Sequence, residues 1–207
     1  MPETASKPLF LCYPFVKAAL VTGKFKYIVQ QPKYTDVNEW VAMNLSDFFS
    51  NINLFLSFTS ESCTVETCPT MSISSSACYP WIEKNGRMTE LPAPQHIDYI
   101  LTWIQNTLDD QSIFPTRFAL EFSSDFPAIA KAIYRQMLHI FAHLYYAHYP
   151  VFLHMSCEAH FNSFFAHFVA FGTELNLLEP KELYSPAGEL LGLGELVGIW
   201  RELQVLA

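Results

Sequence analysis

Two pairs of metal-binding side chains constrain how this 207-residue chain can fold. Cys63 and Cys68 lie in a stretch rich in Ser and Thr, and His143 and His148 lie about eighty residues later in an apolar stretch. Two thiolates and two neutral imidazoles form a tetrahedral set that suits zinc, and four protein ligands leave no position for water or substrate. One ion held by all four would therefore be structural, and it would tie an early loop to a late helix.

Other interpretations of these residues stay open on spacing alone. The cysteines also fit a disulfide or two separate buried thiols, and the histidines also fit core or surface positions. Residues five apart on an ideal α-helix are rotated by roughly 140°. Helix geometry therefore favours His139 with His143, which share one face, and His154 is a further histidine nearby. A ligand at His148 requires a bend in the helix, which Tyr149-Pro150 could cause.

The overall charge argues against some classes of partner. The chain has a net charge of −8 at pH 7, a pI of about 5.3 and no basic run. These features disfavour binding to nucleic acids and to anionic membranes, and a basic protein partner fits better. The length and the 51% hydrophobic content are sufficient for one compact domain with a sizeable core.

Cysteine usage and the apolar stretches predict where the protein resides. Five cysteines are an odd number in a chain too large to need disulfide staples, so we expect reduced thiols. The N-terminus does not resemble a signal peptide, and polar residues interrupt the apolar stretch 137–171, so we expect no membrane insertion. These features predict a soluble cytoplasmic protein, with the nucleus as a second location.

The first ninety residues predict an arm, a helix, a loop and a hairpin. Residues 1–35 read as an irregular arm that wraps on the core. Asp36 followed by Glu39 resembles a capping box that opens a helix from Val37 to about Ser57. The apolar stripe of this helix consists of Trp40, Met43, Phe48, Ile52 and Phe55. Residues 59–76 read as a loop, and the Asn-Gly pair within 78–91 predicts a two-stranded ribbon.

Three further helices follow from apolar residues at helical spacing. We expect one from His96 to about Asp110, preceded by Pro92 and Pro94. The next is capped by Ser124 or Asp125 and has Pro127 in its first turn. The last runs from about Phe152 to Leu175. The predicted class is a mainly α-helical bundle with a small β-hairpin and a metal-pinned loop.

The C-terminal stretch has a different character. Four glycines interrupt a leucine-rich run between residues 188 and 207, and Gly-Glu-Leu occurs at 188 and again at 194. Each glycine inside a helix costs about 1 kcal/mol of helix stability. We therefore expect a frayed or loosely docked tail.

With these segments in place, the chain resembles a known family of kinase coactivators, the Mob family, and most closely its fungal Mob2-like group, which binds NDR-type kinases. The resemblance runs in order from about residue 7 to 183. It is carried by the motifs Lys7-Pro8-Leu9-Phe10-Leu11, Gly23-Lys24-Phe25, Asn38-Glu39-Trp40-Val41-Ala42, Asp47-Phe48-Phe49, Ser62-Cys63-Thr64, Thr67-Cys68-Pro69-Thr70-Met71-Ser72, Leu91-Pro92-Ala93-Pro94-Gln95, Ile97-Asp98-Tyr99, Phe114-Pro115-Thr116, Ile140-Phe141-Ala142-His143 and Glu158-Ala159-His160-Phe161-Asn162.

The resemblance implies a Mob/phocein-like fold and a division of the chain into three parts. These are an N-terminal arm (1–35), a Mob-like helical domain (36–183) and a divergent C-terminal tail (184–207). The resemblance also places the structural zinc site of the family on Cys63, Cys68, His143 and His148. It thereby selects His148 as the partner of His143, where helix geometry favours His139.

The function that the resemblance implies is binding, not catalysis. Members of the family bind the N-terminal regulatory region of an NDR/LATS-type AGC kinase and promote its activity, in Hippo-like signalling, cell polarity and morphogenesis. We expect a monomer or a heterodimer with the kinase. The positions that match the kinase-binding surface are Glu39, Trp40, Asp47, Asn53, Leu54 and His167. Eight residues separate the two carboxylates, so both can project from one side of a helix toward basic partner residues, although an ordinary solvated face is the commoner explanation for such carboxylates.

Two alternatives to kinase activation stay open. One is a general scaffold that binds partners without activating them. The other is a zinc hydrolase or deaminase with Glu66 or Glu158 as general base, which a closed set of four zinc ligands disfavours.

A second surface of the family binds phosphorylated peptides through a basic cluster. The matching positions here are Arg135, Gln136 and His139, of which only Arg135 is a permanent cation. Phosphate capture needs several cations or a bidentate arginine, so we expect phosphopeptide binding to be weak or absent.

Overall fold

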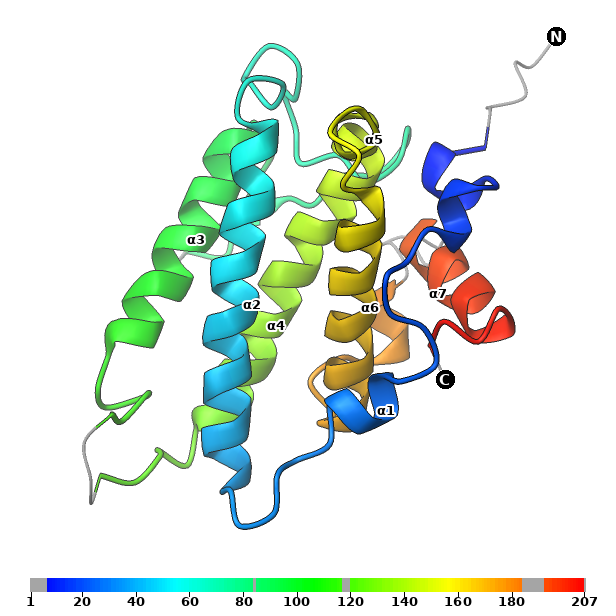
Figure 1. The fold of residues 1–207 in the computed structure, drawn as a ribbon. Coiled ribbons are helices and arrows are strands. Elements are labelled where there is room, and N and C mark those ends of the chain that lie inside the picture. The colour runs from blue at the N-terminus through cyan, green and yellow to red at the C-terminus, as the bar shows by residue number, and fades with distance from the viewer. Residues whose placement is uncertain (1–6, 84, 117–119, 184–191, 207) are drawn as a thin grey trace, which may run out of the picture.

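Four long helices form the body of the computed structural model, which describes residues 7–83, 85–116, 120–183 and 192–206. They are α2 (Val37–Thr59), α3 (Ala93–Asp109), α4 (Phe126–His143) and α6 (Glu158–Glu174). Helix α4 packs against both α2 and α3, and α6 lies on its other side (Figure 1). The predicted mainly helical class is confirmed. Among the described helices, none is both long enough and apolar enough to span a bilayer.

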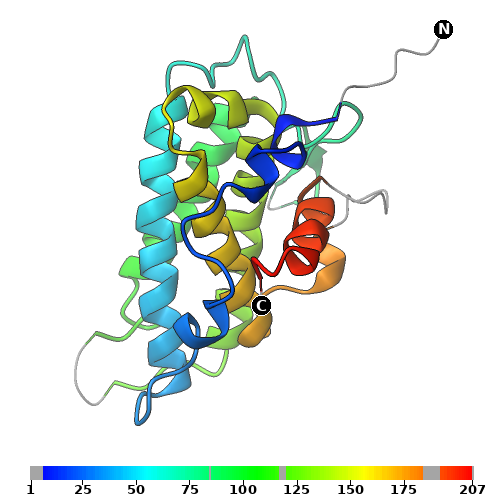
Figure 2. The same ribbon diagram turned by 45° about the vertical axis from the view of Figure 1, so that its right-hand side comes forward.

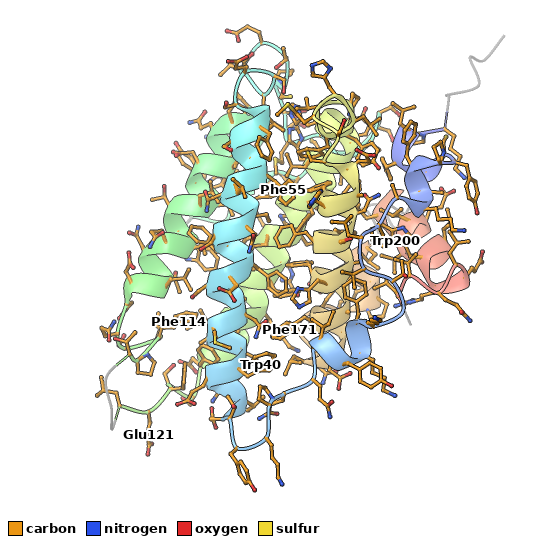
Figure 3. The ribbon with its side chains drawn as sticks, viewed as in Figure 1. Trp40, Phe55, Phe114, Glu121, Phe171 and Trp200 are labelled. Atoms are coloured by element: carbon orange, nitrogen blue, oxygen red, sulfur yellow. The ribbon has the colours of Figure 1, made fainter. Side chains whose placement is uncertain are left out.

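Aromatic side chains fill the space between these helices. Phe48 of α2 meets Tyr134 of α4 and Phe168 of α6, with ring centroids 5.9 and 5.4 Å apart. Both pairs are edge-to-face, the geometry that aromatic quadrupoles prefer. Phe55 of α2 and Phe171 of α6, both labelled in Figure 3, are also buried. The core is therefore continuous from α2 through α4 to α6.

The N-terminal arm is tied to α6 by specific hydrogen bonds. It contains two short 3₁₀ turns, η1 (Leu9–Leu11) and η2 (Phe15–Lys17), and a short helix, α1 (Phe25–Ile28). The buried Asn162 amide donates to the carbonyls of Phe15 and Ala18 at 3.1 and 2.8 Å. The Ser163 hydroxyl accepts from the backbone N–H of Leu20 at 2.7 Å. These bonds hold residues 15–20 of the arm against α6, and the arm runs along that helix (Figure 2).

The predicted hairpin is confirmed. Strands β1 (Trp81–Ile82) and β2 (Met88–Thr89) pair antiparallel, with Trp81 opposite Thr89. Gly86 has a φ of +81° and closes the turn by donating its N–H to the Glu83 carbonyl at 2.9 Å. Only glycine adopts this left-handed conformation without strain, which explains the strength of the Asn-Gly signal.

Two helix boundaries differ from the prediction. Helix α3 begins at Ala93, three residues before the expected His96, because Pro94 occupies the first turn, where a missing N–H costs nothing. The last predicted helix is two elements, α5 (Tyr149–His154) and α6. Ser156 interrupts them with a φ of +52°, a left-handed conformation that ends a helix. Asp125 precedes α4 as predicted, but its side chain makes no capping hydrogen bond.

The expectation of a frayed tail is wrong for the described part of the tail. Residues 192–202 form helix α7 (Gly192–Glu202), which packs against the arm (Figure 2). Trp200 is fully buried, and its indole N–H donates to the Val16 carbonyl at 2.8 Å. Burial of Trp200, Leu196 and Val197 outweighs the helix cost of the glycines. The first Gly-Glu-Leu repeat, at 188, lies outside the described residues.

Candidate functional site

The structure brings the four predicted metal ligands together. The side-chain ligand atoms of Cys63, Cys68, His143 and His148 all lie within 4.8 Å of one another. The Sγ of Cys63 is 3.6 Å from Nε2 of His143, and the Sγ of Cys68 is 3.5 Å from Nε2 of His148. A tetrahedral zinc with its usual bond lengths separates a sulfur from a nitrogen by about 3.6 Å. The spacing of the ligand atoms therefore fits one four-coordinate ion.

The other nitrogen of each imidazole is also held. Nδ1 of His143 is 2.9 Å from the Ser72 carbonyl, and Nδ1 of His148 is 3.2 Å from the Ser62 hydroxyl. Such outer contacts fix the tautomer and aim Nε2 at the metal, as in characterised metal sites. Both partners come from the loop that carries the cysteines. The loop and the histidines thus orient each other.

A π-helical turn places His148 beside His143. Helix α4 passes into η3 (Leu144–His148), a π-turn, before α5 begins. A π-turn has i to i+5 hydrogen bonding, which brings residues five apart closer to one face than an α-helix does. Pro150 has no N–H for the Tyr146 carbonyl, which favours this break in the α-helical ladder. The two imidazole rings are 5.1 Å apart.

Two of the alternatives that spacing left open are wrong. All five cysteines are free thiols, so Cys63 and Cys68 form no disulfide. His139 points away from the cluster, because its ring stacks on Tyr79 with centroids 3.6 Å apart. The set implied by the family resemblance is the one that the structure assembles.

The electrostatics of the pocket suit a cation. Burial, together with the neighbouring Cys68 sulfur, raises the pKa of Cys63 to about 12. Burial, together with His143, lowers the pKa of His148 to about 4, so this imidazole is neutral at pH 7. Neutral imidazole is the form that binds metal, and a bound cation would lower the pKa of Cys63 again.

A second feature is a strip of exposed side chains along the outer face of α2. Glu39, Met43, Asp47, Leu54 and Phe58 are all exposed, and their spacing places them on one side of the helix. Met43 and Leu54 are 53% and 54% exposed. The assignment of Met43 to the buried stripe is therefore wrong. We call these five residues the α2 strip.

The remaining predicted kinase-binding residues are partly buried. The Trp40 indole N–H donates to the Val29 carbonyl at 3.3 Å, and its ring packs 6.1 Å from that of Phe171. The hydrogen bond to Val29 joins the arm to α2, and Trp40 lies near the start of that helix (Figure 3). The amide of Asn53 donates back to the Phe49 carbonyl at 2.9 Å. These two residues support the helix more than they extend its exposed surface.

His167 lies on α6 beside α2. Its ring packs 5.0 Å from that of Phe48, and Asp47 of the α2 strip is near enough to favour its protonation. Burial outweighs that effect and lowers the pKa of His167.

Met43 and Phe58 are the members of the α2 strip that the sequence analysis missed. Their four-residue spacing from Glu39, Asp47 and Leu54 is the signal that could have found them.

The three residues at the phosphopeptide positions do not form a cationic cluster. The Arg135 guanidinium pairs with Glu182 at 2.6 Å. Gln136 and His139 instead line a cavity against the hairpin. The pKa of His139 is lowered to about 3 by burial, so it carries no charge at pH 7.

Comparison with known proteins agrees with this architecture. A sequence model of the Mob1/phocein family matches residues 17–186. The chain is 49% identical over 181 residues to the maintenance of ploidy protein mob2 of Schizosaccharomyces pombe, covering 87% of this chain and 74% of that protein. It is 47% identical over 179 residues to the CBK1 kinase activator protein MOB2 of Candida albicans, covering 86% of this chain and 57% of that protein.

A human relative is also similar to this chain. The chain is 36% identical over 181 residues to MOB kinase activator 2 of Homo sapiens, covering 87% of this chain and 76% of that protein. The family match starts inside the arm and ends just after η4 (Pro180–Leu183), so α7 lies beyond it. With the helical body and the Cys/His cluster in place, the chain belongs to the Mob1/phocein family.

Proposed function

We propose that this protein is a non-catalytic adaptor that binds the N-terminal regulatory region of an NDR/LATS-type kinase and promotes its activity. Relatives in Candida albicans and Homo sapiens are named as kinase activators, which supports a kinase as the partner. The proposed context is signalling in cell polarity and morphogenesis.

The α2 strip is the observation that carries this proposal. Two carboxylates and three large apolar side chains share one exposed face on a helix whose opposite face is locked into the aromatic core. Among the described residues, neither Glu39 nor Asp47 forms an ion pair. Exposed apolar groups flanked by unpaired carboxylates complement an amphipathic segment with basic residues. A kinase hairpin of that character fits this face.

We also propose that the Cys/His cluster holds one structural zinc. Its ligands would be the two thiolates and Nε2 of each imidazole, and the ion would supply a crosslink between the loop and the end of α4. A hydrolase would need an open zinc position, which four protein ligands do not leave. Glu66, one candidate base, is exposed and accepts a hydrogen bond from the Thr64 hydroxyl at 2.7 Å, which lowers its pKa. An acid that stays ionised in solvent is a weak base for such chemistry.

Charge reversal on the α2 strip tests the kinase proposal. Glu39→Lys and Asp47→Lys should each weaken binding to the N-terminal region of an NDR-type kinase by about tenfold. Both carboxylates are exposed, so the melting temperature should stay within a degree or two. Asp98→Lys is the matched control, because Asp98 is an exposed acid on α3. Calorimetric titration and thermal melting of the four proteins separate a lost interface from a damaged fold.

A kinase assay on the same proteins distinguishes a coactivator from a scaffold. Coactivation predicts that kinase activity rises with the concentration of this protein and follows the binding curve. Binding without any rise in activity would leave only the scaffold function.

A further inference from the structure

A second candidate site lies in a cavity that the kinase proposal does not use. The cavity has a volume of about 300 Å³ and opens between the hairpin, α3 and α4. Its walls include the indoles of Trp81 and Trp103 and the side chains of His96, Gln136 and His139. No residue of α2 lines it. A volume at the lower end of the range for ligand sites suits one side chain better than a large molecule.

The lining of this cavity is uncharged. None of the described residues that line it is acidic or basic apart from two histidines. Burial lowers the pKa of His96 to about 4 and that of His139 to about 3, so both imidazoles are neutral at pH 7. Arg135, which lies next to Gln136 on α4, is paired with Glu182. A phosphate or carboxylate would therefore lose its hydration here without meeting a cation.

Two polar atoms at the cavity lack partners. Nδ1 of His96 and Oε1 of Gln136 are buried and make no hydrogen bond. His96 is only 2% exposed. Buried polar groups without partners cost free energy and are rare, and they mark places where a ligand can gain affinity by supplying the missing hydrogen bond. A ligand with a hydroxyl group can donate to one such atom and accept from another.

We propose that this cavity binds a tyrosine side chain presented by a partner protein. The phenol ring would pack against Trp81 and Trp103, since offset and edge contacts between aromatic rings are favourable. Its hydroxyl would reach the polar groups of His96 and Gln136. Phenylalanine has no group for these atoms, proline has no donor, and phosphotyrosine brings a charge that the site does not balance.

The test uses the full chain, labelled with ¹⁵N, and N-acetyl-L-tyrosinamide as the probe. We expect this probe to shift the indole N–H signals of Trp81 and Trp103 and to leave those of Trp40 and Trp200 in place, with a Kd on the order of 1 mM. N-acetyl-L-phenylalaninamide should bind at least about tenfold more weakly, because the buried polar atoms stay unpaired. The phosphotyrosine and proline analogues should cause no shift at these two indoles.

Two variants locate the binding in the cavity. Ala132→Leu fills the cavity from α4 and should abolish the shifts, whereas Ala128→Leu makes the same change at an exposed position of the same helix and should preserve them. Gln136→Leu keeps the volume, removes the acceptor, and should bring the Kd values for the tyrosine and phenylalanine probes close together. Binding of the kinase region should be unchanged in all three variants, so a failure here is separable from a failure of the α2 strip.

Several results would overturn the proposal. They are the absence of any shift at Trp81 and Trp103, equal binding of the tyrosine and phenylalanine probes to the unaltered protein, and tighter binding of the phosphotyrosine or proline analogue. If Ala132→Leu melts like the unaltered protein and still binds the probe, the cavity is not the site.

Discussion

Removal of the proposed zinc should have a large effect on stability. A ligand that binds only the folded state stabilises it by about 4 kcal/mol when its free concentration is a thousand times its Kd. Domains of this size have total stabilities of about 5–15 kcal/mol, and each kcal/mol moves the melting temperature by about 2–4 °C. Chelation should therefore lower the melting temperature by about 8–16 °C. The remaining aromatic core should keep the chain folded at 25 °C.

Cys68→Ser makes this prediction specific to the cluster. Cys68 is buried with its Sγ 3.5 Å from His148, so its replacement removes one of four ligands. We expect the variant to melt like the chelated protein and to respond no further to chelator. Cys157→Ser changes a thiol outside the cluster and should keep the full response.

Mass spectrometry under non-denaturing conditions and calorimetry are the assays. The unaltered protein should carry one zinc per chain. Hydrogen exchange should accelerate on chelation in residues 60–79 and 144–154, the two segments that the cluster joins. A structural role for the zinc is contradicted if zinc is bound but chelation leaves the melting temperature unchanged, or if Cys68→Ser keeps the response to chelator.

Three further predictions concern the fold. Gly172→Ala should lower the free energy of unfolding by about 1–3 kcal/mol in a urea titration, because the new Cβ would lie 2.5 Å from the buried ring of Tyr134. An unchanged midpoint of the urea transition would contradict this packing. Trp200→Ala should lower the free energy of unfolding by about 3–5 kcal/mol in the same measurement, since the Trp200 side chain is fully buried against the arm. A loss below about 1 kcal/mol would instead indicate that the tail is loosely docked. Burial lowers the pKa values of His96 and His139 to about 4 and 3, so the unfolded chain binds protons first as the pH falls below about 6.5. Stability present at pH 7 should thus decrease by about 2 kcal/mol for each histidine at pH 5, and equal urea midpoints at the two pH values would refute the assignment.

The sequence predicted the elements whose signals are local. The hairpin follows from the left-handed conformation that Gly86 adopts, and α2 begins where Asp36 accepts hydrogen bonds from the N–H groups of Asn38 and Glu39 at 2.8 and 3.3 Å. Both depend on a few neighbouring residues. Turns and helix caps of this kind can be predicted without knowledge of the tertiary structure.

Features that depend on distant contacts were not predictable from local patterns. Helix α7 is held by contacts such as the hydrogen bond from the Trp200 indole N–H to the Val16 carbonyl, which joins residues 184 positions apart in the sequence. The pairing of His143 with His148 depends on a π-turn, whereas ideal helix geometry points to His139. Only the family resemblance identified the four side chains that the structure brings together. The hydropathy of Met43 is compatible with either the buried or the exposed face of α2. The packing of α4 and α6 decides which face is buried, and Met43 lies on the exposed one.

A titration of kinase activity shows whether the α2 strip recruits and activates a kinase, as proposed. The activity of a full-length NDR-type kinase is titrated with the unaltered protein, with the double variant Glu39→Lys/Asp47→Lys, and with Asp98→Lys. The two carboxylates lie about 12 Å apart along the helix, so their effects should roughly add, and the double variant should need about a hundredfold more protein for half-maximal activation. Activation by the double variant at the same concentration as the unaltered protein, or an equal loss with Asp98→Lys, would show that the α2 strip is not the kinase-binding surface.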